Sequence, residues 1–276
     1  MGLFDKKYCD VCGSKIGLLG NRKLEDGNLC KECAGKLSPW FSDRRRSTVQ
    51  DIKNQLAYRE ENQQKVAAFH TTRTIGQDYM VFLDEDAKKF CVARSRDMRN
   101  GNPDILDFSQ VTGCELEIEE SKDEVEYKDK EGKSVSYNPP RYDYSYDFNI
   151  HLHVNHPYFD EMTFQINPSS VRIAYGSLMP AAGVGAAPGG RPGPRPPMRP
   201  MGGTAAFDPT KNAEYQQYVA MGNELKEVIM QARQNARDEA AAANAPKEAV
   251  TCPHCGASTI PDISGCCEFC GGALNG

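Results

Sequence analysis

The sequence lacks a long apolar run: no segment approaches the roughly 18 apolar residues that a membrane-spanning helix needs. The first residues, MGLFDKKYCD, also lack the apolar core of a secretory signal. The chain also lacks an excess of positive charge, since its 33 Lys and Arg residues against 38 Asp and Glu residues give a net charge of −5. This balance excludes a chain-wide attraction to nucleic acid or anionic lipid. We therefore expect a cytoplasmic protein with no transmembrane segment.

The motifs of several large enzyme classes are absent as well. The GxSxG of serine hydrolases, the P-loop, the GxGxxG of dinucleotide binding and the HExxH of zinc proteases do not occur. Histidine is scarce, at five residues, and His151 and His153 would bind a metal only with a third ligand such as Asp147. We interpret them as side chains on the solvated face of a sheet and predict that the protein is not an enzyme.

Cysteine, by contrast, is abundant and clustered near the two ends of the chain. In a cytoplasmic protein, paired CxxC sequences are typical of metal ligands rather than of a disulfide framework. Only Cys91 and Cys114, which we expect in the core, lie between the clusters. The N-terminal cluster contains Cys9, Cys12, Cys30 and Cys33, and the C-terminal cluster contains Cys252, Cys255, Cys266, Cys267 and Cys270.

The N-terminal cluster predicts a structural zinc site. Its two CxxC pairs are 17 residues apart, which is within the spacing of known zinc sites. Gly13 follows the first pair, and Asp26-Gly27 offers a hairpin turn before the second. A short helix is expected to open at Ala34–Leu37, and Trp40 is expected to pack beneath the metal. These features predict a treble clef with Zn²⁺ bound by Cys9, Cys12, Cys30 and Cys33.

The C-terminal cluster predicts a compact zinc ribbon. Cys252 and Cys255 form its first pair, and Cys267 with Cys270 is the simplest second pair because it restores a CxxC followed by glycine. Cys266 remains the alternative third ligand. Two Zn²⁺ per chain are therefore expected. Each would be held by four thiolates, so neither ion has an open position at which to activate water.

A helix and a β-rich segment follow the first zinc module. Ser47 and Gln50 fit a capping box, and apolar spacing predicts a helix from about Thr48 to Phe69. Its middle, residues 59–64, is polar on all sides, which indicates a strut through solvent or two shorter helices. Strand patterns then run from residue 78 to residue 175, and the strict alternation over Tyr144–Val154 is the clearest.

The acidic segment Glu115–Glu131 carries nine acids and three lysines, a charge of −6. We interpret it as a solvated hairpin, with calcium or a basic partner as alternative ligands. Between residues 179 and 203, 14 of 25 residues are Gly or Pro, which predicts a flexible insertion that serves as a spacer or as a ligand for an aromatic groove. Asp208-Pro209 then begins a helix, expected to end near Arg237 and to cover the sheet.

The predicted fold class is multidomain α+β. About seven strands followed by one amphipathic helix resemble the pleckstrin-homology-like superfold, an antiparallel sheet or barrel with a covering helix. The predicted parts are a treble-clef module at 1–42, a connecting helix at 43–70, a PH-like β domain at 71–178 plus 208–238, a Gly/Pro/Arg-rich insertion at 179–207, a linker at 239–249 and a zinc ribbon at 250–276.

The segment MGLFDKKYCDVCGSKIGLLGNRKLEDGNLCKECAGKLSPWF resembles the N-terminal zinc domain of an uncharacterised bacterial family, known only as a domain of unknown function. The similarity covers roughly residues 1–70, and DFSQVTGCELEI and SYNPPRYDYSYDF are also similar to that family. The resemblance implies a cytoplasmic location and zinc at the four N-terminal cysteines. It implies no activity, because none is established for the family.

Together these observations favour a non-catalytic zinc-binding scaffold or adaptor that presents surfaces to unidentified protein partners, with a membrane-proximal location left open. The alternative is a zinc-ribbon regulator that binds nucleic acid through Arg44, Arg45 and Arg46. The acidic total and the lack of aromatic residues among these arginines weigh against it. An enzyme with an unrecognised site is the third hypothesis.

Overall fold

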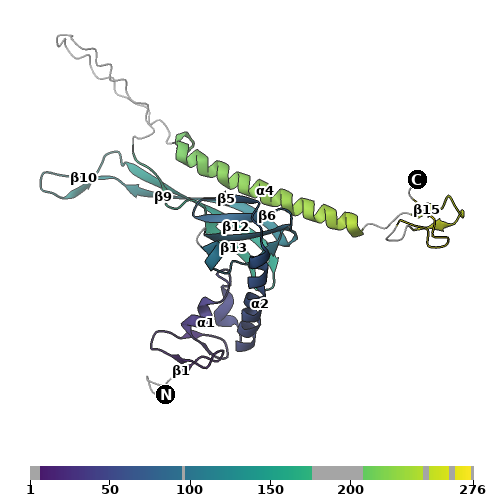
Figure 1. Ribbon diagram of the computed structural model, residues 1–276. Helices are drawn as coiled ribbons and strands as arrows, with labels where there is room; N and C mark the ends of the chain where they lie inside the picture. The colour runs from purple at the N-terminus through teal and green to yellow at the C-terminus, as the bar shows by residue number, and fades with distance from the viewer. Residues whose placement is uncertain (1–6, 95–96, 176–207, 245–248, 261–264, 275–276) are drawn as a thin grey trace, which may run out of the picture. The chain divides into compact units, whose positions relative to one another are not determined.

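The computed structural model describes residues 7–94, 97–175, 208–244, 249–260 and 265–274 (Figure 1). The chain divides into two compact units, Met1–Arg233 and Gln234–Gly276. The fold is mixed α+β, as predicted, with small antiparallel sheets, few helices and a group of four cysteines in each unit. The predicted Gly/Pro/Arg-rich insertion at 179–207 lies outside the described residues.

The first unit begins with a small module built from two short hairpins and one helical turn. The hairpins pair β1 (Lys7–Tyr8) with β2 (Lys15–Ile16) and β3 (Arg22–Lys23) with β4 (Asn28–Leu29). The predicted turn at Asp26-Gly27 is present, since the Leu24 amide donates to the Gly27 carbonyl at 2.9 Å. The helix α1 spans Lys31–Gly35. It therefore begins three residues before the predicted Ala34, because Cys30 caps it by accepting the Cys33 amide on its sulfur.

A 3₁₀ turn, η1 (Asp43–Arg46), leads into α2 (Val49–Ala68). The N-cap of α2 is Thr48 rather than the predicted Ser47: its hydroxyl accepts the Asp51 amide, and the Asp51 carboxylate accepts the Thr48 amide at 2.9 Å. The helix is continuous, so the expectation of two shorter helices is wrong. Ile52 at its start joins the small core of the N-terminal module, as do the half-buried Val49 and Leu56.

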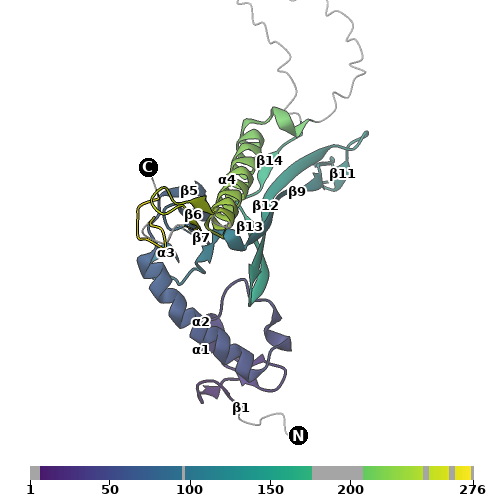
Figure 2. The same ribbon diagram turned by 90° about the vertical axis from the view of Figure 1, so that its right-hand side faces the viewer.

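The polar middle of α2 is not a strut through solvent. Arg59 and Asn62 are only 8% and 0% exposed, because they pack against the loop at residues 102–105. The Arg59 guanidinium pairs with Asp104 at 2.7 Å, and the Asn62 amide donates to the Pro103 carbonyl at 2.7 Å and accepts the Ile105 amide at 3.0 Å. Figure 2 shows α1 beside one end of α2 and α3 (Asp97–Asn100) toward the other.

The first of two four-stranded antiparallel sheets has the order β5-β6-β7-β8. One face packs on the end of α2, where the buried Phe82, Cys91, Ala93 and Ile105 meet Val66 and Phe69. The sheet's strands are β5 (Arg73–Gly76), β6 (Tyr79–Asp84), β7 (Lys89–Arg94) and β8 (Leu106–Asp107), and the 3₁₀ turn η2 (Phe108–Gln110) follows them.

The second sheet is built on β12 (Tyr142–His156), which has β9 (Val111–Glu124) on one side and both β13 (Phe159–Gln165) and β14 (Val171–Ile173) on the other. The predicted alternation is present from Tyr146 to Val154, where every second side chain is buried. The tip of the β9–β12 hairpin holds β10 (Glu126–Lys128) paired with β11 (Ser134–Ser136).

A long helix, α4 (Ala213–Asn244), covers the second sheet with its first half. It begins after the 3₁₀ turn η3 (Pro209–Lys211) and extends beyond the predicted end at Arg237. The Tyr215 ring lies 5.0 Å from that of Tyr146. Gly222 allows close approach, since a Cβ there would lie 2.8 Å from the Leu116 methyl carbons. The helix therefore covers the second sheet, as predicted, and does so through its apolar side chains.

Trp40 packs between the two sheets and not beneath the cysteines, where it was expected. Its ring centroid lies 6.4 Å from that of Tyr79 on β6 and 6.4 Å from that of Phe164 on β13. The N-terminal module instead fills its core with aliphatic residues such as Leu24 and Leu29, which are fully buried. Through these contacts, Trp40 packs the segment that follows the N-terminal module against β6 and β13.

Candidate metal centres

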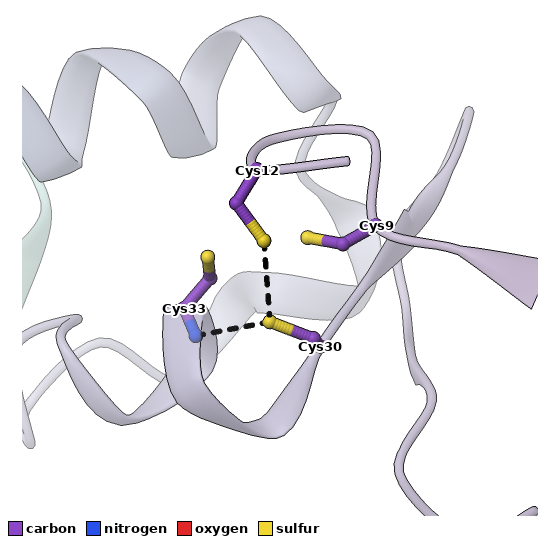
Figure 3. A group of neighbouring side chains, drawn as sticks. All are labelled: Cys9, Cys12, Cys30 and Cys33. Atoms are coloured by element: carbon purple, nitrogen blue, oxygen red, sulfur yellow. Dashed lines mark hydrogen bonds between the residues drawn. The ribbon is translucent and has the colours of Figure 1, made fainter. Parts of the chain in front are cut away.

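The first group of four cysteines converges as the sequence predicted. Its four sulfur atoms all lie within 4.8 Å of one another (Figure 3), and they belong to Cys9, Cys12, Cys30 and Cys33. The Cys12 and Cys30 sulfurs are 3.7 Å apart, and the Cys33 amide donates to the Cys30 sulfur at 3.3 Å. Three of these cysteines are buried and Cys12 is exposed, so the group lies at the edge of the small core. It could hold one metal ion.

Backbone hydrogen bonds place the cysteines of this group. In the first pair, the Cys9 amide donates to the Ser14 carbonyl at 2.9 Å, and the Gly13 amide donates to the Cys9 carbonyl at 2.8 Å. Gly13 has φ of +74°, a conformation that glycine adopts without strain. The second pair stands at the start of α1, as in a treble clef. The backbone conformation around each CxxC pair therefore brings the four sulfurs close together.

The thiols of the first group differ in acidity. Hydrogen bonds with Ser14 lower the pKa of Cys12 to about 6, whereas burial raises the pKa of Cys33. A lowered pKa favours the thiolate, which is the form that binds metal.

The second group lies in the C-terminal unit, whose described residues include a small hairpin of β15 (Val250–Thr251) and β16 (Ser258–Thr259). The sulfurs of Cys252 and Cys270 are 3.6 Å apart and those of Cys255 and Cys267 are 3.7 Å apart. All four lie within 4.8 Å of one another. This second group also could hold one metal ion.

The sulfur that joins those of Cys252, Cys255 and Cys270 in the second group is that of Cys267. The Cys267 amide donates to the Gly272 carbonyl and its carbonyl accepts the Gly271 amide, both at 2.8 Å. The same two bonds form around Cys252, with Ala257 and Gly256, so the two halves of the ribbon repeat one turn. Cys267 is 1% exposed, whereas Cys266 is half-buried and forms a β-bridge with Ala273.

Serine substitutions of the adjacent Cys266 and Cys267 test the assignment of Cys267 as a metal ligand. We expect Cys267→Ser to lose one metal ion per chain, because a hydroxyl replaces one of four sulfur ligands, while Cys266→Ser keeps the full metal content. The measurement is metal per chain by elemental analysis of each purified variant. Equal metal content in the two variants, or loss only in Cys266→Ser, would contradict the assignment.

The three arginines predicted as a nucleic-acid surface separate in the structure. The Arg44 guanidinium donates to the Lys23 carbonyl at 3.0 Å, and that of Arg46 pairs with Asp43 at 2.5 Å. Arg45 is exposed on the same 3₁₀ turn. Arg44 and Arg45 line one cavity together with residues 21–25 of the N-terminal module, whereas Arg46 pairs with Asp43 of its own turn.

The histidine pair on β12 does not assemble with Asp147. The two ring nitrogens of His151 contact Glu161 at 2.6 Å and Glu117 at 2.8 Å, while Asp147 accepts a hydrogen bond from Gln165 at 2.9 Å. The hydrogen bond with Glu161 raises the pKa of His151. The sequence did not connect these two glutamates with His151, because they lie on neighbouring strands and only the β register brings them to the histidine.

Comparison with known proteins finds one similarity. Residues 7–55 match the model of a family described as a domain of unknown function (DUF4428). No curated protein and no solved structure matches the chain. The match confirms the predicted resemblance of the N-terminal module to an uncharacterised domain, while a bacterial origin and the PH-like fold stay predictions. Among the described residues, no helix is both long and apolar enough to cross a bilayer.

Proposed function

We propose that the protein is a non-catalytic, cytoplasmic adaptor in which two structural zinc ions hold the ends of the chain in shape. The observation that supports the zinc ions in this proposal is the spacing of the sulfurs. A tetrahedron with Zn–S bonds of about 2.3 Å has edges of about 3.8 Å. Three sulfur pairs in the two groups are separated by 3.6–3.7 Å, which is close to that value.

Four thiolates per ion favour structural zinc over catalytic zinc. Soft sulfur ligands in tetrahedral array suit Zn²⁺, and a catalytic zinc keeps a position open for water or substrate. In each group the four sulfurs fill that position. A cytoplasmic location fits, because reducing conditions keep such cysteines available as thiolates.

The surface best suited to a protein partner is the end of the β9–β12 hairpin, which we call the arm (residues 119–143). From Glu119 to Glu124 every residue of β9 is exposed, and Figure 1 shows β9 continuing toward β10 beyond the rest of the sheet. The arm has eight acids against five basic residues. Its charge favours a basic protein surface as partner.

Aromatic contacts stiffen the arm before any partner binds. The rings of Tyr127 and Tyr137 are 4.9 Å apart, and the Arg141 guanidinium lies 3.9 Å from the Tyr137 ring centroid. Tyr127 remains 42% exposed. Tyrosine is enriched in protein interfaces, and a preordered surface loses less entropy on association.

A shortened arm tests the adaptor role. Because Glu124 pairs directly with Tyr142, an Asn-Gly turn can join these two residues and replace 125–141 without disturbing the sheet. We expect the full zinc-loaded chain to retain protein partners in affinity capture from its native cell and the shortened variant to lose them. The control is that both proteins hold two zinc ions and melt at similar temperatures. An identical set of captured proteins, or none with either chain, would contradict the adaptor role.

A further inference from the structure

Two adjacent leucines stand almost fully exposed at the tip of the N-terminal module. Leu18 and Leu19 are 90% and 89% exposed, the highest values among the large hydrophobic residues that the structure describes. They occupy the central positions of a turn that closes through the Gly20 amide and the Gly17 carbonyl at 3.0 Å. The preceding Ile16 is buried, so the turn is anchored in the module while its two leucines point away from the core.

A basic cleft begins directly after this turn. Residues 21–25, together with Arg44 and Arg45, line a cavity of about 750 Å³. Four of these seven residues are cationic and one is acidic: the cations are Arg22, Lys23, Arg44 and Arg45, and the acid is Glu25. The Arg22 guanidinium donates to the Leu19 carbonyl at 3.3 Å, so the cleft and the leucine turn form one continuous surface.

The cations of the cleft are available to an anion. None of the four takes part in the ion pairs found within the described part of the chain, whereas the neighbouring Arg46 does. Burial and the charges of Arg22 and Arg45 lower the pKa of Arg44, which indicates that these like charges repel one another. A bound anion would relieve this repulsion.

An anionic bilayer offers a favourable environment to both parts of this surface, the leucine turn and the basic cleft. Exposed apolar side chains leave water when they enter the boundary between headgroups and acyl chains, and lipid phosphates attract nearby Lys and Arg. A nucleic acid would supply phosphates but no apolar phase for the leucines. The net charge of −5 for the chain does not oppose this local attraction, since charges farther away than a Debye length are screened.

We propose that the Gly17–Gly20 turn and the basic cleft together bind the surface of an anionic lipid bilayer, with Leu18 and Leu19 inserted and the four cations on lipid phosphates. This activity goes beyond the adaptor role and does not require a protein partner. It would bring the N-terminal zinc module to a membrane without a spanning helix.

The test is co-flotation of the zinc-loaded full chain with vesicles of phosphatidylcholine alone or mixed with phosphatidylserine. Wild type is expected to float with the mixed vesicles and not with phosphatidylcholine alone. The double substitution Leu18→Ser/Leu19→Ser is expected to weaken binding about tenfold or more, because two leucine side chains no longer leave water. Phe269→Ser, at an exposed position of the other unit, is the matched control and should bind as wild type.

Charge is tested separately with Arg45→Glu, which should also lose vesicle binding, while Lys133→Glu at an exposed arm position should not. All variants should retain two zinc ions per chain, which shows that the fold is intact. Failure of wild type to float, or flotation unchanged by the double leucine substitution, would overturn the proposal. So would binding to a single-stranded RNA that exceeds vesicle binding and survives the loss of both leucines.

Discussion

Removal of zinc with a strong chelator is expected to unfold the N-terminal module while the two four-stranded sheets keep their structure. Among the described residues, the core of the module has only eight buried members, and three of them are the proposed ligands Cys9, Cys30 and Cys33. A segment of this size cannot bury enough apolar surface to fold alone. Zinc binding worth roughly 10–16 kcal/mol would supply the difference. Hydrogen exchange of the backbone amides before and after metal removal measures the effect.

Substitution of a ligand should have the same consequence as chelation. Cys33→Ser removes one sulfur, and the amides of β1 to β4 and α1 are then expected to exchange quickly. Cys114→Ser is the matched control, because Cys114 is equally buried but belongs to the second sheet and to neither cysteine group. That variant should keep both zinc ions. A module that stays protected from exchange without metal would contradict the zinc assignment.

Arg59→Ala is expected to destabilise the first unit by about 3–5 kcal/mol. The Arg59 and Asp104 side chains are 9% and 0% exposed, so the substitution leaves a buried carboxylate without its counter-charge. It also removes the donors to the Lys36 and Asn102 carbonyls. Chemical denaturation followed by circular dichroism measures the loss.

The control for this prediction is Arg46→Ala. Arg46 pairs with Asp43 at a similar distance, but its side chain is 81% exposed, and exposed pairs contribute about 0–1 kcal/mol. Burial raises the pKa of Asp104, so its carboxyl is more easily neutralised than usual. The deficit of Arg59→Ala should therefore be smaller in mildly acidic than in neutral solution. Equal losses in the two arginine variants would show that the buried pair does not stabilise the unit.

The two cysteine groups could be predicted because their determinants are local. A CxxC pair and the glycine that follows it specify one tight turn, and the choice of Cys267 over Cys266 follows from the position of Gly271. The buried face of β12 was predictable for a similar reason, since alternation with period two lies within a single strand. Each CxxC turn and the buried face of β12 are thus specified by residues that are close together in the sequence.

The role of the polar middle of α2 could not be predicted in the same way. Arg59 and Asn62 look solvated because no apolar stripe surrounds them, yet their partners lie about 40 residues later in the loop at 102–105. The same limit applies to Trp40, whose aromatic neighbours come from β6 and β13, and to His151, which meets Glu117 and Glu161 across strands. Only the tertiary fold brings these groups together.

The arm has a further consequence for solubility. Past Glu120, β9 pairs with β12 on one edge and with no other strand in the described part of the chain, so its outer backbone groups could pair with a second copy. The charges of Glu124, Glu126 and their acidic neighbours oppose that pairing by mutual repulsion. Concentrated salt weakens this protection, and the outer edge of β9 is then where aggregation of the protein would begin.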